Sequence, residues 1–259
     1  MKRSMIFGLA LCAAAPAGAQ TVDDVFSMSV RTGWRAADGT HVAAIEVRLA
    51  SGWKTYWRQP GDAGIPPVFD WSGSENFETA QVVWPMPDIS WDQGMRSIGY
   101  SDRVVFPLIV DPQTNGAIDL NGKIQLGICD EICIPVMVTV RAELPGQGAF
   151  DSTIQNAIDA QVPRSNQTVT CSFAPTSDSM QVELGLPQIS QHKPDVVLEV
   201  AEPGLWIAEP TVARAGGQWH AQTEILSASG QPTAVSRSDV RITVFSDDQA
   251  IEYKGCTAP

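Results

Sequence analysis

Residues 123–140 read KIQLGICDEICIPVMVTV, and this stretch decides the fold. Cys129 and Cys133 lie between two runs rich in Ile and Val, which are residues that β-strands prefer. Four steps along a straight strand span roughly 13 Å, whereas the Cα atoms of a disulfide lie about 4.4–6.8 Å apart. If the two cysteines pair, the chain must turn at residues 130–132, and we expect a hairpin. One helical turn would also bring them together, but Pro135 and the flanking β pattern oppose it.

The rest of the chain continues the β pattern, with short runs separated by clusters of Gly, Pro, Asp and Asn. This spacing predicts an all-β protein made of antiparallel sandwiches. In the first half, the other candidate strands are residues 26–31, 42–49, 82–84 and 104–110, and the candidate turns are residues 59–62, 64–67 and 111–116. In the second half, the candidate strands are residues 168–173, 180–186, 195–200, 218–226, 240–245 and 251–254.

A change of pattern near Gly148 indicates a boundary between two regions. Asp151 and Ser152 can cap a short helix, in which apolar residues follow at helical spacing until Pro163 ends it. The length of the chain suits two sandwich domains. We therefore expect a first sandwich at residues 20–146, a linker with a short helix at residues 147–165 and a second sandwich at residues 166–259.

The first 19 residues predict a secretory signal peptide. Lys2 and Arg3 precede an apolar run at residues 5–15, and Ala17-Gly18-Ala19 forms an A-x-A cleavage site. No other stretch approaches the roughly 18 uninterrupted apolar residues that a membrane span needs. We therefore expect cleavage near Ala19 and no direct membrane insertion of the mature protein. The short, alanine-rich signal favours the bacterial periplasm, where disulfides persist.

The net charge of the chain limits the classes of partner that we expect it to bind. Loss of the signal peptide would change the formal net charge from −12 to −14. This acidic balance argues against nucleic acid, whose phosphates need a basic face, and it is compatible with protein partners. The sequence has no G-x-S-x-G, H-E-x-x-H, thioredoxin C-x-x-C or phosphate-binding glycine motif, and we expect no cofactor.

Four cysteines remain after the signal peptide, and their spacing favours pairing Cys129 with Cys133 and Cys171 with Cys256. The second pair would close a long loop and stabilise an exported domain by roughly 4 kcal/mol in the chain-entropy model. We interpret it as a structural disulfide, and the competing interpretation is a second redox pair.

The first pair would close a very short loop, so its entropic contribution to stability is small. A short bridge at a turn is easier to reduce than a long-range bridge, which favours a redox role for Cys129 and Cys133. Two alternatives stay open. The pair is a structural staple, or its thiolates bind Cu(I) together with a methionine or histidine. The scattered positions of His41, His192 and His220 disfavour the metal site.

Asp130 and Glu131 lie between the two thiols in sequence. Carboxylates beside a thiol raise its pKa and reduce the thiolate fraction, and no Lys, Arg or His is adjacent in sequence to compensate. The pair is then expected to react slowly with random oxidants and fast with a docked partner. The alternative is that both carboxylates simply lie in solvent.

Three motifs, in the same order, resemble the N-terminal periplasmic domain of the DsbD/ScsB-type protein-disulfide reductases, a thiol:disulfide interchange protein family. They are residues 52–67 (GWKTYWRQPGDAGIPP), residues 99–108 (GYSDRVVFPL) and residues 129–135 (CDEICIP). Together they cover about residues 22–145. The second region resembles the extra sandwich of the ScsB-like branch, with weaker motifs.

The resemblance implies immunoglobulin-like sandwiches in which Cys129 and Cys133 are the catalytic, redox-active cysteines. A membrane thiol reductase of the DsbD/CcdA type would reduce their disulfide. The dithiol would then reduce periplasmic thioredoxin-like proteins through a mixed disulfide. By position, residues 91–98 match the cap loop of the family. Trp91, Met95 and Tyr100 are the residues expected to shield the pair until a partner docks.

The sequence departs from the full-length family in two ways, because it has neither a membrane-embedded segment nor a C-terminal thioredoxin domain. We expect a free-standing form, with those functions on separate polypeptides, that acts as a component of a protein-disulfide reductase. Two other functions remain as alternatives. One is a non-catalytic binding module of the envelope, and the other is a periplasmic copper-handling protein.

Overall fold

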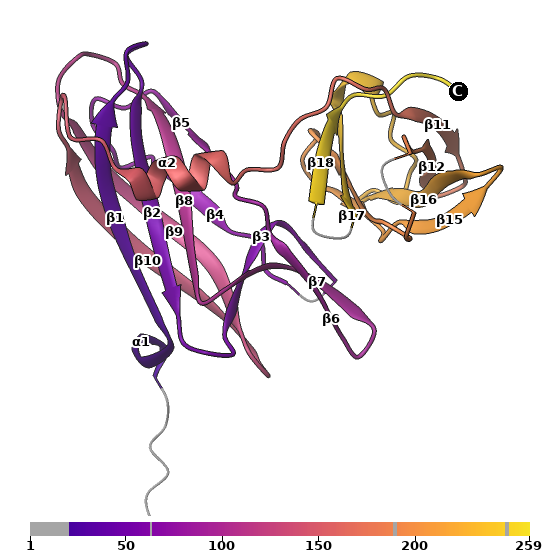
Figure 1. Cartoon of the computed structure of the whole chain (residues 1–259), viewed down its shortest axis with the longest axis horizontal. Helices are drawn as coiled ribbons and strands as arrows, with labels where there is room; N and C mark the ends of the chain where they lie inside the picture. Colours follow the sequence, from indigo (N-terminus) through magenta and orange to yellow (C-terminus); the bar gives the residue numbers. More distant parts are fainter. Residues whose placement is uncertain (1–20, 63, 189–190, 247–248) are drawn as a thin grey trace, which may run out of the picture.

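The computed structural model describes residues 21–62, 64–188, 191–246 and 249–259. The predicted signal peptide, residues 1–19, lies outside the described residues. The described part consists almost entirely of antiparallel strands, with two short α-helices, α1 (Val22–Val25) and α2 (Ser152–Asp159), and a 3-10 helix, η1 (Arg237–Asp239). The prediction of an all-β protein is therefore confirmed (Figure 1).

Two sheets face each other in the N-terminal half of the chain. One sheet has the order β1-β2-β8-β5, with bounds Phe26–Arg35, His41–Leu49, Arg103–Asp111 and Thr79–Val82. The other has the order β10-β9-β3-β7-β6, with bounds Cys133–Leu144, Ile118–Cys129, Lys54–Gly61, Met95–Ser101 and Asp88–Asp92. Strand β4 (Val68–Asp70) pairs with β9. Between the sheets, alternate apolar side chains form a buried core that includes Ile45, Phe106, Leu120 and Ile128.

Two further sheets form the C-terminal half. The first has the order β11-β12-β16-β14, with bounds Thr170–Pro175, Ser179–Gly185, Gln218–Ser227 and Leu205–Ile207, and β15 (Thr211–Ala215) also pairs with β16. The second has the order β13-β17-β18, with bounds Asp195–Val200, Val240–Ser246 and Gln249–Lys254. A second apolar cluster fills the space between these sheets and includes Leu184, Leu198, Ile225 and Ile242.

Helix α2 begins where the sequence predicts it. The Asp151 carboxylate accepts hydrogen bonds from the backbone N–H groups of Thr153 and Ile154, which is the standard N-cap arrangement. Ile154 is buried in a small cluster with Val42 and other apolar residues of the β1-β2-β8-β5 sheet. Figure 1 shows the helix lying across this sheet before the chain crosses to β11. The helix therefore packs on the first pair of sheets and is more than a free connection.

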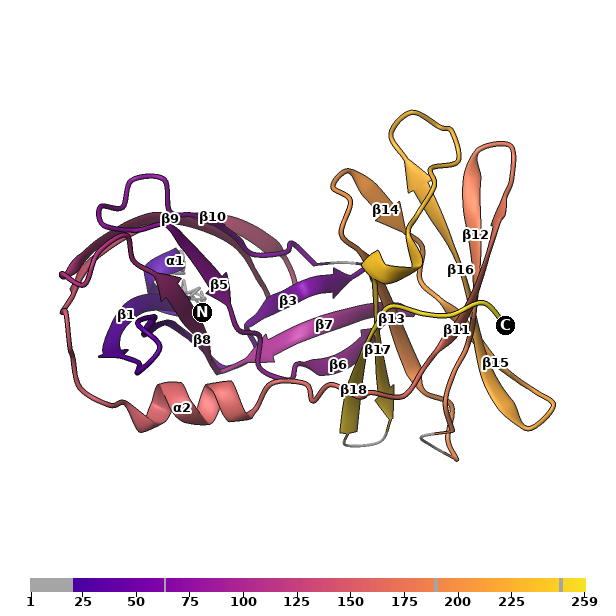
Figure 2. The same cartoon turned by 90° about the horizontal axis from the view of Figure 1, so that it is seen from above.

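The core of the N-terminal half continues into the C-terminal half. Trp57 on β3 is fully buried, and its ring packs edge to face on Phe245 of β17 with 5.8 Å between ring centroids. The next residue, Arg58, makes ion pairs with Glu199 of β13 and Glu252 of β18 at 2.9 and 2.8 Å. Figure 2 shows β3, β7 and β6 extending toward β13, β17 and β18. Strand β3 thus belongs to a sheet of the N-terminal half and also contacts the C-terminal half.

Strand β3 also corrects one prediction from the sequence. The sequence predicts a turn at residues 59–62, because they contain Pro60 and Gly61. In the structure β3 runs through Gly61, with a shift in its pairing to β7 between Tyr56 and Gly61. Proline and glycine are tolerated in a strand at such an irregularity, where the regular ladder of hydrogen bonds is interrupted.

Candidate redox site at the β9–β10 hairpin

Cys129 and Cys133 form a disulfide at the tip of the β9–β10 hairpin. Cys129 is the last residue of β9, Cys133 is the first residue of β10, and the two stand directly opposite each other in the ladder with Cα atoms 4.1 Å apart. In the three-residue connection, the Asp130 N–H donates to the Ile132 carbonyl oxygen at 3.1 Å. The hairpin that the sequence predicts at residues 130–132 is confirmed.

The two cysteines differ in exposure. Cys129 is only 2% exposed, whereas Cys133 is exposed. Thiol–disulfide exchange begins with attack of a thiolate on one of the two sulfur atoms, so access decides which atom is attacked. Cys133 is therefore the residue of the pair that is more accessible from solvent.

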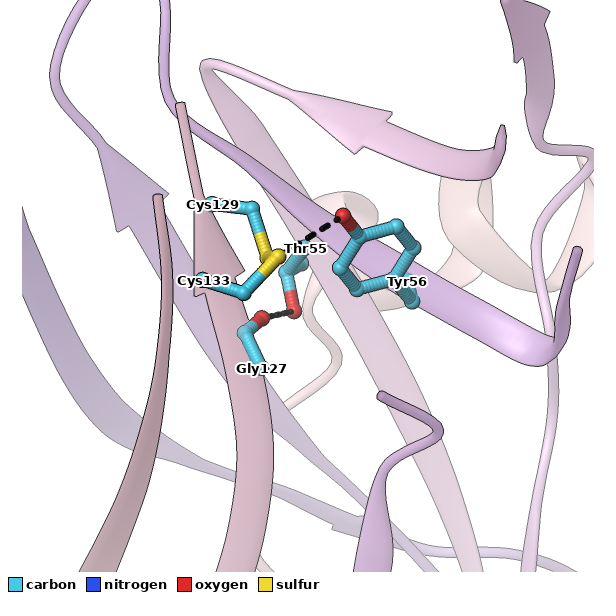
Figure 3. Close-up of a disulfide and its surroundings, with 5 residues drawn as sticks. All are labelled: Thr55, Tyr56, Gly127, Cys129 and Cys133. Atoms are coloured by element: carbon cyan, nitrogen blue, oxygen red, sulfur yellow. Dashed lines mark hydrogen bonds between the residues drawn. A yellow bond between two sulfur atoms is a disulfide. The ribbon is translucent and has the colours of Figure 1, made fainter. Parts of the chain in front are cut away.

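The neighbouring strand β3 places two hydroxyl groups at this hairpin (Figure 3). The Tyr56 hydroxyl lies 3.7 Å from Cys133 Sγ, and the Thr55 hydroxyl donates to the Gly127 carbonyl oxygen at 3.0 Å. Tyr56 is buried, and burial raises the pKa of its phenol. The phenol therefore keeps its proton at neutral pH and remains a possible hydrogen-bond donor to sulfur.

Strand β3 also brings a cation to the pair. Lys54 is the direct cross-strand partner of Cys129 in the β3–β9 ladder. Directly opposed residues of an antiparallel pair present their side chains on the same face with Cβ atoms about 5 Å apart. The sequence alone missed Lys54, Thr55 and Tyr56 as site residues, although they lie inside the 52–67 motif. No local periodicity indicates which distant strand pairs with β9.

The segment after β3 covers this face of the sheet. A Cβ atom at Gly64 would lie 2.5 Å from the ring of Tyr56, and one at Gly127 would lie 2.7 Å from Cβ of Ile65. Ile65 therefore occupies the space above Gly127, and the backbone at Gly64 lies against the Tyr56 ring. This contact explains why Tyr56 is only 2% exposed although it lies beside the exposed residue Cys133.

A shallow cavity of about 280 Å³ lies on the other side of the hairpin connection. Its lining combines apolar and acidic residues, among them Val25, Trp53, Glu131, Ile132 and Ile134. Ile132 is 66% exposed at the tip of the hairpin. The connection between the two cysteines thus presents an exposed apolar side chain beside two acidic residues.

The three predicted shielding residues lie in different places. Tyr100 is buried, donates from its hydroxyl to the Pro85 carbonyl oxygen at 2.8 Å and packs on Phe106, so it belongs to the core. Trp91 and Met95 are exposed at the turn between β6 and β7.

The sheet register gives the position of that turn relative to the disulfide. Ser101, at the opposite end of β7, pairs with Lys54, which pairs with Cys129. Ser101 is thus the end of β7 that aligns with Cys129, and the turn that carries Trp91 and Met95 lies at the other end of β7. Shielding by these residues stays a prediction.

Cys171 and Cys256 form a second disulfide in the C-terminal half. Cys171 is fully buried on β11, and its N–H donates to the Thr257 carbonyl oxygen at 2.7 Å. The bridge spans 85 positions of sequence and ties the last residues of the chain to β11. Its position in the second apolar cluster suits a structural role.

Two further observations concern metals and membranes. Within residues 21–259, apart from the undescribed positions, no three His, Cys, Asp or Glu side chains are grouped so that they could hold a metal ion. In the same described part of the chain, no helix is long and apolar enough to cross a membrane.

Comparisons with known proteins agree with the geometry of the hairpin. Residues 18–145 match the family described as "Thiol:disulfide interchange protein DsbD, N-terminal". A crystal structure of the N-terminal periplasmic domain of ScsB from Proteus mirabilis has a similar fold, with a TM-score of 0.69 and 21% sequence identity over 93% of this chain and 96% of that chain. No protein with a curated description matches the sequence. Residues 18–145 of the chain, which contain the Cys129–Cys133 hairpin, therefore belong to the DsbD N-terminal domain family.

Proposed function

We propose that the protein is a periplasmic thiol–disulfide interchange protein. It would pass reducing equivalents from a membrane thiol reductase of the DsbD/CcdA type to periplasmic thioredoxin-like proteins. One observation carries this proposal: an exposed Cys133 is bonded to a buried Cys129 at the tip of a hairpin, in a domain of an interchange family.

In the reducing half of the cycle, a thiolate of the membrane reductase attacks Cys133 Sγ. The Cys129–Cys133 bond breaks, its electron pair stays on Cys129 as a thiolate, and Cys133 forms a mixed disulfide with the reductase. A second thiolate of the reductase then attacks its own sulfur in this mixed disulfide and releases Cys133 as a thiolate. The reductase has been oxidised by two electrons, and the hairpin holds a dithiol.

In the oxidising half, the Cys133 thiolate attacks a disulfide of the thioredoxin-like protein and displaces one of its thiolates. Cys129 then attacks Cys133 Sγ, re-forms the hairpin disulfide and releases the reduced partner. Both halves use Cys133 as the sulfur that meets the partner and Cys129 as the sulfur that completes the exchange. The buried position of Cys129 keeps it from being attacked by small thiols in solution.

The length of the loop supports a redox role over a purely structural one. The Cys129–Cys133 bridge spans 4 positions of sequence, compared with 85 for Cys171–Cys256. In the chain-entropy model the short loop contributes about 2 kcal/mol and the long loop about 4.5 kcal/mol. A disulfide that contributes less to folding stability is correspondingly easier to reduce.

The proposal is tested by equilibrating the protein in defined thiol–disulfide buffers and trapping free thiols by alkylation. We expect the Cys129–Cys133 pair to become reduced under conditions that leave Cys171–Cys256 oxidised, so the second disulfide is an internal control. A hairpin pair that stays oxidised as long as the second disulfide would contradict the proposal.

A capture experiment tests the assignment of the two sulfur atoms. The variant Cys129→Ser should hold a mixed disulfide between Cys133 and a thioredoxin-like partner, because the resolving thiol is absent. Cys133→Ser should capture much less, because its remaining thiol is buried. If a double Cys→Ala variant bound the same partner as tightly as the wild type, a non-catalytic binding module would be the better description.

A further inference from the structure

We propose that Tyr56 is a catalytic residue of this site. Its hydroxyl donates a hydrogen bond to the sulfur anion of Cys133 whenever that sulfur carries negative charge. This inference rests on the proposed function and adds a residue and a chemical role to it.

The charges around the pair show why such a donor is needed. Asp130 and Glu131 follow Cys129 in the hairpin, and both line the cavity at the hairpin tip. Carboxylates near a thiol disfavour its ionised form. Lys54 is the cation that the sheet register brings to the pair, and it stands opposite Cys129. Cys133, whose sulfur meets the partner in the proposed cycle, lies on β10, which is separated from the strand of Lys54 by β9.

The position of Tyr56 matches this need. The phenol oxygen is 3.7 Å from Cys133 Sγ, within hydrogen-bonding reach of sulfur, and a phenol O–H can donate to it. The ring is held between the sheet and the segment that contains Pro60 and Gly64, whose atoms lie close to each other and to the ring. The next residue on β3, Trp57, is fully buried in the core. The hydroxyl is therefore fixed in place before the reaction, and a fixed donor costs little reorganisation when charge develops.

The chemistry needs no proton transfer. When the reductase leaves the mixed disulfide, the breaking S–S bond leaves its electron pair on Cys133 Sγ, and the Tyr56 O–H donates to this anion. When the Cys133 thiolate attacks a client disulfide, the same hydrogen bond holds it until the new S–S bond forms. Burial raises the pKa of Tyr56, so the phenol keeps its proton through both steps. The contact of the Tyr56 hydroxyl is with Cys133 Sγ, which assigns the donor to this sulfur of the pair.

The test measures the pKa of the Cys133 thiol in a Cys129→Ser background, from the pH dependence of alkylation or of thiolate absorbance. Tyr56→Phe keeps the ring and removes only the hydroxyl. We expect it to raise the Cys133 pKa by about one unit, which is a tenfold loss in thiolate fraction at neutral pH. Exchange with a small disulfide at pH 7 should slow only about threefold, because the remaining thiolate becomes more nucleophilic with a Brønsted coefficient of roughly 0.4–0.5.

Tyr253→Phe is the matched control. Tyr253 is a buried tyrosine on β18 in the C-terminal half, and burial also raises its pKa. Its replacement should leave the Cys133 pKa unchanged. An equal Cys133 pKa in the Tyr56→Phe variant and its parent would overturn the inference, even if the hairpin pair still cycled between thiol and disulfide.

A second measurement guards against a packing effect of Tyr56→Phe. A fluorinated tyrosine placed at position 56 alone keeps the shape of the ring and makes the phenol a stronger donor, so the Cys133 pKa should fall below that of the parent. A Cys133 pKa that rose with both replacements would show that only packing matters and would overturn the inference. The redox titration of the Cys129–Cys133 pair is a separate readout, so failure of the proposed function is distinguishable from failure of this inference.

Discussion

Tyr56 and Trp57 are consecutive residues of β3, yet their side chains contact different parts of the molecule. The Tyr56 hydroxyl lies 3.7 Å from Cys133 Sγ, and the Trp57 ring packs on Phe245 of the C-terminal half. Successive side chains of a strand point to opposite faces, so a single extended segment joins the candidate redox site to the interface between the two halves. The interface therefore helps to hold β3, and with it Tyr56, in its observed position.

The first prediction concerns the ion pairs at this interface. Glu252 is 5% exposed and contacts Arg58 at 2.8 Å and Arg164 at 2.9 Å. Glu252→Gln would leave the nearly buried Arg58 without one of its two carboxylate partners. Removing one partner of a buried ion pair costs roughly 3–5 kcal/mol. We expect a loss of about 3 kcal/mol in the free energy of unfolding, measured by denaturant titration.

Arg164→Ala is the control for this measurement. The Arg164 side chain is 62% exposed, so its ion pair with the same carboxylate contributes at most about 1 kcal/mol. Equal effects of the two substitutions would show that the ion pair between Arg58 and Glu252 does not stabilise the interface.

The second prediction compares the two disulfides. Replacing Cys171 and Cys256 by alanine should lower the free energy of unfolding by about 4.5 kcal/mol, because the denatured chain regains the freedom of a long loop. Replacing Cys129 and Cys133 should cost about 2 kcal/mol for the short loop. Denaturant titration of the two double variants gives the comparison. A larger loss from the hairpin pair would make that pair the structural one.

The third prediction tests the segment that covers the site. A methyl group at position 127 would meet Cβ of Ile65 at 2.7 Å, so Gly127→Ala should displace Ile65. Overpacking of this kind costs about 1–3 kcal/mol. We expect Gly127→Ala to cost much less in an Ile65→Gly background, because glycine removes the Cβ atom that the new methyl group would meet, and a double-mutant cycle measures the coupling.

Gly116→Ala is the matched control, because its nearest side-chain atoms would lie at 3.6 Å or more from the new methyl group. This substitution should change stability by less than about 0.5 kcal/mol. If the two substitutions at positions 65 and 127 had simply additive effects, Ile65 would not rest on Gly127.

The fourth prediction is a pH dependence that comes from His41. This side chain is fully buried, its Nε2 lies 2.6 Å from the Thr32 carbonyl oxygen, and burial lowers its pKa below the ordinary value. In the unfolded chain the imidazole titrates near 6.5. As the pH falls below about 6.5, the unfolded chain therefore binds a proton that the folded chain resists, and the folded state is destabilised.

We expect the free energy of unfolding to decrease between pH 6.5 and pH 5 with a slope of up to about 1.4 kcal/mol per pH unit. The variant His41→Gln should show a much smaller slope over this range, whatever its stability at pH 7. Denaturant titrations at several pH values measure both slopes, and an unchanged slope in the variant would assign the effect to another group.

The elements that the sequence predicts well are those with a local signal. The β9–β10 hairpin follows from two β runs and a cysteine pair whose Cα distance forces a turn. Helix α2 follows from the Asp151 cap and the helical spacing that places Ile154 on the buried face. Strand β13 is predicted with its observed bounds at residues 195–200. In each case the periodicity and the end signals lie within about ten residues of each other.

The parts that the sequence does not predict depend on contacts between distant residues. No cation is adjacent to Cys129 in the sequence, but Lys54 pairs with Cys129 in the sheet across 75 positions. Strand β3 itself was missed because Pro60 and Gly61 suggest a turn. Strands β6 and β7 were missed because their residues alternate weakly and their pairing depends on β3. Register between distant strands is a property of the folded sheet and leaves little trace in local composition.

The continuity of the core through Trp57 has a consequence for how the protein can be divided. The family relationship ends at residue 145, but the apolar cluster around Trp57 also includes Val162, Val197 and Phe245. A fragment cut at residue 145 would expose one edge of the Trp57 indole and leave Arg58 without either of its carboxylate partners. The segment that matches the family, residues 18–145, is therefore shorter than the segment whose residues form the complete hydrophobic core. Dissection of this protein needs a later boundary, or a polar replacement of Trp57.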